Sequence, residues 1–512
     1  MNVNIRRCVL ILACLAALCA AQQPAVASSP PKWASPVQLG GDLPSSWFPD
    51  IQADATGAVR IVFSASLIEG DVNEIDGLHG AVLISELGAD GWSEPADIAV
   101  MDGGIASRPM IASDGQYAHL IYRTADPGVP VRVVYRRAPL TSDLGNVHSW
   151  SQPLILSSDE AYWTQIAVLP NGGLLVVYNR VTQVDVNGVH DRRTGIFSRR
   201  SLDQGATWEP EVRVVETIGR VARTSLAVDP ASGNAVLVWD EGYDNLTAQG
   251  VPEAVAAAVS SDGGASWGYH VRYPNDAEQS LVVTNGTLTV WFYRSVVDST
   301  IYYRTSEDGG AQWSLQRPVP DAVARPYSGP HNFDKLSAAF DGDGRLLFTW
   351  VGADEAAPNG VSVMLATYAD GVWTPPEVIA SPVGWAEYPR IAVALGNRVE
   401  LVYFVRDKEF DVGAYTLWTV RGTSDAKAVA PQEFAPVYAP TATVPSPAPI
   451  AIATQPTVPA ETTPLETEIR WNDTPQKTLT SPVLPILGIT AAALLGALLV
   501  RRLVDMVRDA QI

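Results

Sequence analysis

The chain has 512 residues and a formal net charge of −20, and hydrophobic residues make up 47% of it. This length allows a large buried core in one domain or several. The acidic balance argues against nucleic acid as a partner and against a polybasic membrane-surface role, so an anionic ligand would require locally concentrated positive charge.

Residues 1–27 have the pattern of a secretory signal peptide. Arg6 and Arg7 precede an apolar run, and small residues at Ala25 and Ala27 suit cleavage. All the cysteines of the chain fall within this segment: Cys8, Cys14 and Cys19. We therefore predict a mature chain with no disulfide and no thiol catalyst.

One unit recurs seven times between residues 33 and 424. Each unit begins with a strand, a turn and a second strand rich in β-branched and aromatic residues. The equivalent first-strand positions are Ile51, Ile111, Ile166, Leu226, Leu281, Ala338 and Ile391. The turn dipeptides Asp114-Gly115, Asn171-Gly172, Asn285-Gly286 and Asp343-Gly344 stand where hairpins would close.

The pattern S-x-D-x-G-x-x-W occurs in the later half of three units, with its Asp at Asp203, Asp262 and Asp308. Such an Asp can accept hydrogen bonds from nearby backbone N–H groups, and the Gly supplies a positive φ. The motif resembles the Asp box (BNR repeat) of sialidases and their β-propeller relatives. The resemblance implies a β-propeller in which the boxes are structural and lie on the face away from the site. Sialidases with this box have six blades, so seven units depart from the enzyme family.

The last unit ends without the tryptophan-containing outer strand of the others. Trp33–Leu39, at the start of the mature chain, matches Trp150–Leu156 closely. We therefore predict an all-β, seven-bladed propeller closed by its N-terminal strand, with Trp33–Leu39 beside Tyr415–Val420.

Three further segments follow the propeller. Residues 425–481 are rich in Pro, Thr and Ala and predict a disordered stalk. Residues 482–502 contain an apolar run that ends at Arg501 and Arg502, which predicts one transmembrane helix with a cytoplasmic tail at 503–512. We expect a monomeric head outside the cell, anchored in the plasma membrane.

Candidate site residues lie three positions before each aligned first-strand residue, at one predicted level around the propeller axis. They are Phe48, Arg108, Trp163, Arg223, Glu278, Lys335 and Tyr388. The sialidase resemblance implies Arg108 and Arg223 as anion clamps. It also implies Tyr388 as a nucleophile activated by Glu278, and Asp71 or Asp76 as the acid/base.

Two interpretations of these residues remain open. In the first, the head binds or hydrolyses glycans, with an anionic, sialoside-like sugar at the mouth. In the second, the charged side chains form a mutually paired rim on a non-catalytic scaffold for a protein or glycan partner. We predict no cofactor and no metal, because the histidines are scattered and no ligand series is complete.

Overall fold

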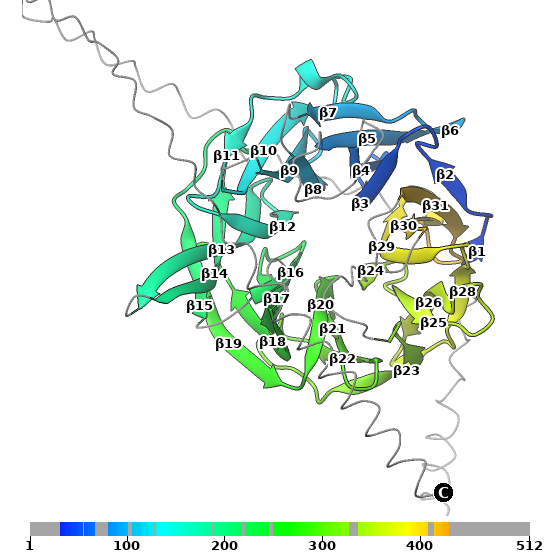
Figure 1. The fold of residues 1–512 in the computed structure, drawn as a ribbon. Helices are drawn as coiled ribbons and strands as arrows, with labels where there is room; N and C mark the ends of the chain where they lie inside the picture. The colour runs from blue at the N-terminus through cyan, green and yellow to red at the C-terminus, as the bar shows by residue number, and fades with distance from the viewer. Residues whose placement is uncertain are drawn as a thin grey trace, which may run out of the picture. The chain divides into compact units, whose positions relative to one another are not determined.

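The computed structural model describes residues 31–54, 56–66, 80–100, 105–125, 130–186, 189–217, 221–244, 249–326, 336–407 and 414–429. The chain forms antiparallel sheets arranged around a central axis (Figure 1). The predicted signal peptide, residues 430–481 of the predicted stalk and the C-terminal helix, together with Asp71, Asp76 and Lys335, lie outside the described residues. The predicted start of the stalk is too early, because Asp425 pairs with Arg345 at 2.7 Å and Ala426 is buried. Among the residues that are described, no helix is long and apolar enough to cross a membrane.

The sheets form seven blades, which confirms the predicted count. Blade 1 contains β3 (Ser45–Ala53), β4 (Val59–Ser66), β5 (Gly80–Gly88) and β7 (Ala96–Val100), with β6 (Gly91–Trp92) also on β5. Blade 2 contains β8 (Ile105–Ser113), β9 (Tyr117–Ala125), β10 (Arg132–Pro139) and β11 (Leu154–Ile155). Blade 3 contains β12 (Ala161–Val168), β13 (Leu174–Val186), β14 (Val189–Ser201) and β15 (Val212–Thr217). Blade 4 contains β16 (Val221–Val228), β17 (Ala235–Asp244), β18 (Gln249–Ser260) and β19 (Gly268–Pro274).

The other three blades follow in chain order. Blade 5 contains β20 (Ala277–Thr284), β21 (Thr289–Ser295), β22 (Thr300–Ser306) and β23 (Arg317–Val323). Blade 6 contains β24 (Ser337–Phe340), β25 (Leu346–Ala353), β26 (Val361–Ala369) and β28 (Glu377–Ala380), with β27 (Val372–Trp373) also on β26. Blade 7 contains β29 (Trp385–Ala394), β30 (Arg398–Arg406), β31 (Tyr415–Thr423), and β1 (Lys32–Trp33) and β2 (Val37–Leu39).

The N-terminal strand closes the ring as predicted. Leu39 pairs with Leu417 and Val37 with Thr419, while Trp33 pairs with Gly422 farther along β31. Because the first and last ordered strands share blade 7, the ring is closed by ordinary sheet pairing.

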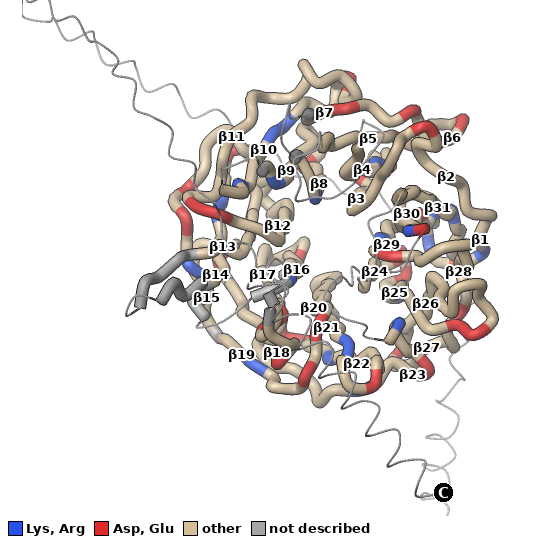
Figure 2. Tube along the Cα trace, viewed as in Figure 1, with Lys and Arg blue, Asp and Glu red and all other residues tan. Residues whose placement is uncertain are grey.

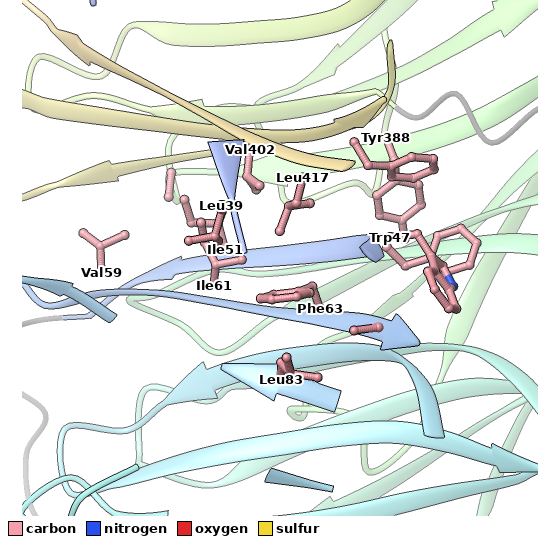
Figure 3. Packing of buried hydrophobic residues seen from close by; sticks show 14 of the residues in the cluster. Leu39, Trp47, Ile51, Val59, Ile61, Phe63, Leu83, Tyr388, Val402 and Leu417 are labelled. Atoms are coloured by element: carbon pink, nitrogen blue, oxygen red, sulfur yellow. The ribbon is translucent and has the colours of Figure 1, made fainter. Parts of the chain in front are cut away.

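The core lies between the blades. A cluster of buried hydrophobic side chains occupies each interface between neighbouring blades. At the interface of blades 7 and 1, Leu39, Ile61 and Leu417 pack together (Figure 3). At the interface of blades 5 and 6, Phe292 stacks on Phe348 with ring centroids 4.2 Å apart. Each blade therefore buries its apolar faces only when both neighbours are in place.

The three Asp boxes pack blades 3, 4 and 5 each against the preceding blade. In the box of blade 3, the Asp203 carboxylate accepts hydrogen bonds from the backbone N–H of Thr207 (2.8 Å) and the Ser201 hydroxyl (2.8 Å). Gly205 has φ 81° and faces Tyr135 of blade 2, whose Oη would lie 1.8 Å from an added Cβ. Trp208 packs edge-on against the same Tyr135 ring at 4.9 Å. These contacts agree with the predicted structural role of the boxes.

A β-bulge, which the sequence did not predict, interrupts the innermost strand of six blades. Two residues there stand opposite one residue of the second strand, for example between Ser107 and Met110 of β8. The first residue of the bulge has a positive φ at Phe48 (49°), Arg108 (50°), Trp163 (38°) and Tyr388 (56°). These four residues therefore occupy equivalent positions in their blades, and the backbone is strained at each of them.

Blade 5 differs from the predicted alignment by one residue. Its bulge residue is Gln279, with φ 61°, and Glu278 is the last paired residue before the bulge. In blade 4 the two unmatched residues, 222 and 223, place Arg223 within the bulge.

Candidate functional site

The innermost strands of blades 1 to 4 bring arginines and aromatic rings together around the axis. The Arg108 guanidinium carbon lies 3.8 Å from the centroid of the Phe48 ring and 4.5 Å from that of Trp163. The Arg223 guanidinium carbon lies 5.9 Å from the same Trp163 ring. The two predicted anion clamps thus share one aromatic ring, in contacts of the cation–π type.

Local backbone geometry fixes Arg108 in this position. Its φ of 50° turns the chain at the bulge, and Pro109 follows it. The Arg108 backbone N–H donates to the Ser64 hydroxyl of blade 1 at 2.9 Å. Arg108 is partly exposed, whereas Phe48 and Trp163 are buried. Strained non-glycine residues persist where the surrounding structure holds them, and they cluster at ligand-binding sites.

Glu278 lies between two arginines. It forms ion pairs with Arg223 (3.7 Å) and with Arg294 of the neighbouring strand (2.9 Å). All three side chains are buried. Because each charge has an opposite partner, this cluster can be buried without leaving an isolated charge.

A second cluster of the same kind occupies blades 6 and 7. Glu387 pairs with Arg325 at 3.2 Å and also with Arg406. The Arg294 side chain donates to the Arg325 carbonyl oxygen at 2.8 Å, which joins the two clusters. Both ion-pair clusters are buried, and their carboxylates belong to the first strands of blades 5 and 7.

Asp240, at the end of β17, supports the bulge of blade 5. Its carboxylate accepts hydrogen bonds from the backbone N–H groups of Gln279 and Ser280, both at 2.8 Å. Burial, with a smaller contribution from Glu278, raises the pKa of Asp240 to about 6, against the opposing effects of Arg223 and Ser280. The effect of this carboxylate is to hold the backbone beside Glu278.

Tyr388 and Glu278 lie in different surroundings. The Tyr388 ring contacts Phe48 at 5.4 Å and Phe404 at 6.2 Å, and it belongs to the apolar cluster between blades 7 and 1 (Figure 3). Glu278 belongs to the arginine cluster of blades 4 and 5. The contacts of these two residues do not form the nucleophile–base pair that the resemblance implied.

The structure contains a different tyrosine–glutamate pair, Tyr162 and Glu160, beside Trp163. The Tyr162 hydroxyl donates to the Glu160 carboxylate. The i, i+2 spacing of two such residues at the start of a strand was the available sequence signal, because alternate residues share a face.

Blade 7 is tied to blades 1 and 2 through Asp50. Its carboxylate accepts from the Arg390 Nε at 3.0 Å and, through the other oxygen, from the Ile111 backbone N–H at 3.0 Å. One side chain therefore fixes the relative positions of three inner strands at the closing interface. Among the described residues, no group of three or more His, Cys, Asp or Glu side chains is placed to hold a metal ion.

Comparison with protein families identifies residues 136–347 as a BNR repeat-like domain. No curated protein sequence matches the chain.

Solved structures with a similar fold include a protein of unknown function from Dyadobacter fermentans, at 14% identity and TM-score 0.45, covering 77% of this chain and 99% of that one. The NanB sialidase of Streptococcus pneumoniae is similar at 11% identity and TM-score 0.44, covering 77% and 70%. An intramolecular trans-sialidase from Ruminococcus gnavus is similar at 13% identity and TM-score 0.43, covering 77% and 98%. At these values the chemistry of the site has to be argued from this chain's own residues.

Proposed function

Since the chain is a sialidase-like β-propeller of the Asp-box (BNR repeat) family, we propose that its head binds an acidic glycan where the innermost strands of blades 1 to 4 meet. One observation carries the proposal: Arg108 and Arg223 both lie over the Trp163 ring. A guanidinium group suits the carboxylate of an acidic sugar, and an aromatic face suits the apolar face of a sugar ring.

The charge distribution supports an anionic ligand. The whole chain carries a net charge of −20, and acidic residues are spread over the outer parts of the blades (Figure 2). On the inner strands and their immediate neighbours, by contrast, the described residues include arginines from several blades: Arg108, Arg223, Arg294, Arg325, Arg390 and Arg406. Local positive charge on an acidic protein steers anions to that place.

Binding is better supported than hydrolysis. Tyr388, the nucleophile that the resemblance implies, packs among aromatic rings. Glu278, its implied base, is shared by Arg223 and Arg294. Asp71 keeps its proposed acid/base role only if the head also turns over its ligand.

The proposed setting is the cell surface. We propose that residues 1–27 direct secretion and that residues 482–502 anchor the chain in the plasma membrane, with 425–481 as the connecting stalk. This arrangement would present the propeller to glycans outside the cell.

Replacing Arg108 by methionine should lower the affinity for sialyllactose at least tenfold, because the charge is lost while an apolar side chain still fills the space between Phe48 and Trp163. Titration calorimetry on the full-length chain in detergent micelles measures this. The matched control is Arg137→Met, since Arg137 also lies over an aromatic ring, Tyr117 at 4.7 Å, but its side chain donates to the Asp203 carbonyl of the blade 3 box.

Equal affinities of wild-type chain and Arg108→Met, or no binding to any acidic sugar on a glycan array, would refute the proposal. A fluorogenic sialoside assay tests hydrolysis separately. Turnover that disappears in Tyr388→Phe would replace binding by hydrolysis as the function of this site.

A further inference from the structure

Beside Arg108 and Trp163, the same two blades carry a second arginine–aromatic pair. Arg123, on the second strand of blade 2, lies with its guanidinium carbon 5.7 Å from the centroid of the Tyr162 ring. Its Nε donates to the hydroxyl of Ser107, the residue before Arg108, at 3.0 Å. Tyr162 is the residue before Trp163. The second pair is therefore adjacent to the first: Tyr162 precedes Trp163 on one strand, and Arg123 is bonded to the residue before Arg108.

The second pair lies farther from the axis than the first. Arg108 belongs to β8, the innermost strand of blade 2, and Arg123 belongs to β9, the next strand outward. Still farther out, Arg132 on β10 forms an ion pair with Asp159 at 3.6 Å. Arginines of three successive strands thus lie along the junction of blades 2 and 3, from the axis toward the rim.

The chain that enters blade 3 supplies a hydrogen-bond acceptor to this row. The Glu160 carboxylate accepts from the Tyr162 hydroxyl, and Glu160 is partly exposed. A carboxylate has room for several hydrogen bonds, so it can accept from neighbouring sugar hydroxyls as well. Arg123 is also partly exposed, and its guanidinium group presents its N–H donors in a planar fork that suits the oxygens of a sugar.

We propose that Arg123, Tyr162 and Glu160 form a second sugar subsite, which binds the residue next to an acidic sugar held at Arg108. This inference rests on the proposed function and narrows it. The ligand is an acidic oligosaccharide lying along the junction of blades 2 and 3, with its acidic sugar innermost. Glu160 accepts from hydroxyls of the second sugar, Arg123 donates to its oxygens, and no bond is made or broken.

Two ligands that share an acidic sugar test the proposal on the full-length chain. The methyl glycoside of sialic acid fills only the inner subsite, whereas sialyllactose can reach both. Glu160→Gln should weaken sialyllactose about tenfold, the effect of losing charge-assisted hydrogen bonds. The same change should leave the affinity for the methyl glycoside within about twofold. Arg123→Met, a second variant on the other blade, should give the same selective loss.

Glu209→Gln is the matched control, because Glu209 is another glutamate of blade 3 with a side-chain partner, Arg200 at 2.7 Å, but it lies next to the Asp box. It should change neither affinity. Equal loss for both ligands in Glu160→Gln, or no loss for either, would overturn the second subsite while binding at Arg108 still stood. If Arg108→Met bound both ligands as the wild type does, the inner site itself would be refuted.

Discussion

At the scale of single residues, Asp240 makes the charge around the inner site depend on pH. It is buried, its carboxylate holds the bulge of blade 5, and burial raises its pKa from 3.8 to about 6. Arg223, Glu278 and the N–H groups of Gln279 and Ser280 are the charged and polar groups that face it. Because the folded-state pKa lies above the ordinary value, the stability that Asp240 contributes is present below about pH 4 and declines as the pH rises through about 6.

The same proton should alter ligand binding. Protonation of Asp240 removes one negative charge near Arg223. The affinity for an acidic sugar should therefore increase roughly two- to fivefold as the pH falls from 7.5 to 5.5. Calorimetric titrations across this range measure the change. In Asp240→Asn the affinity should be nearly constant, since the neutral amide does not titrate. A pH dependence that persists unchanged in this variant would contradict the assignment.

At the scale of single elements, the Asp box of blade 4 holds its turn through the hydrogen bonds that its carboxylate accepts. Asp262 accepts from the Ser266 N–H (2.9 Å), the Ser266 hydroxyl (2.5 Å) and the Ser260 hydroxyl (2.8 Å). Burial opposes the effect of these bonds, but together they lower the pKa of Asp262. Its contribution to stability is therefore present above about pH 4 and declines as the pH falls through the lowered pKa.

Replacing Asp262 by alanine should reduce the free energy of unfolding by about 1–2 kcal/mol at pH 7, because three donors lose their acceptor. Urea unfolding of the full-length chain gives the value. Asp298→Ala is the control, since the backbone N–H of Thr300 (3.0 Å) donates to that carboxylate in an exposed turn, and a smaller loss is expected. The box variant should bind sialyllactose as the wild type does. A loss of binding equal to that of Arg108→Met would contradict a purely structural box.

At the scale of the whole molecule, closure depends on a short strand whose two apolar side chains differ in burial. Leu39 is 4% exposed and packs in the cluster between blades 7 and 1, whereas Val37 is 60% exposed on the same strand. The pairing is non-covalent, because the only cysteines of the chain lie within residues 1–27. The packing of a few side chains therefore decides how firmly the ring is held.

Leu39→Ala should lower the free energy of unfolding by about 2–4 kcal/mol, since it leaves a cavity in a packed interface. Val37→Ala, a truncation smaller by one carbon at an exposed position of the same strand, should cost less than about 0.5 kcal/mol. Thermal unfolding followed by circular dichroism compares the two variants. Equal effects would mean that the pairing of β2 with β31, rather than burial of Leu39, closes the ring.

Much of the architecture could be predicted from the sequence, because the repeated units can be aligned with one another and each should form the same structure. The aligned positions and the unmatched strand Trp33–Leu39 predicted both the blade count and the closure. The detailed arrangement of the site was harder to predict. A bulge is a local change of register with no fixed residue type, so the shift from Glu278 to Gln279 in blade 5 had no sequence signal.

Contacts between blades were the other part that sequence could not supply. The predicted ring placed Phe48, Arg108 and Trp163 at one level, but the distance between neighbouring blades decides whether an arginine lies between two rings. The Tyr162–Glu160 pair was within reach of sequence reasoning, because alternate residues of a strand share a face. The implied pairing of Tyr388 with Glu278 took its residue types from the family resemblance without a predicted contact.

The pairing of β2 with β31 also constrains the order in which the protein matures. The Thr419 hydroxyl donates to the Val37 carbonyl oxygen across 382 positions of sequence. During synthesis, β1 and β2 are made first, and their edges stay unpaired until β31 of blade 7 has been made. Contacts of such long sequence separation form slowly, and an unpaired edge strand is prone to aggregate. Agents that shield an extended, apolar N-terminal segment should therefore improve the yield of the folded head more than agents that act on the finished ring.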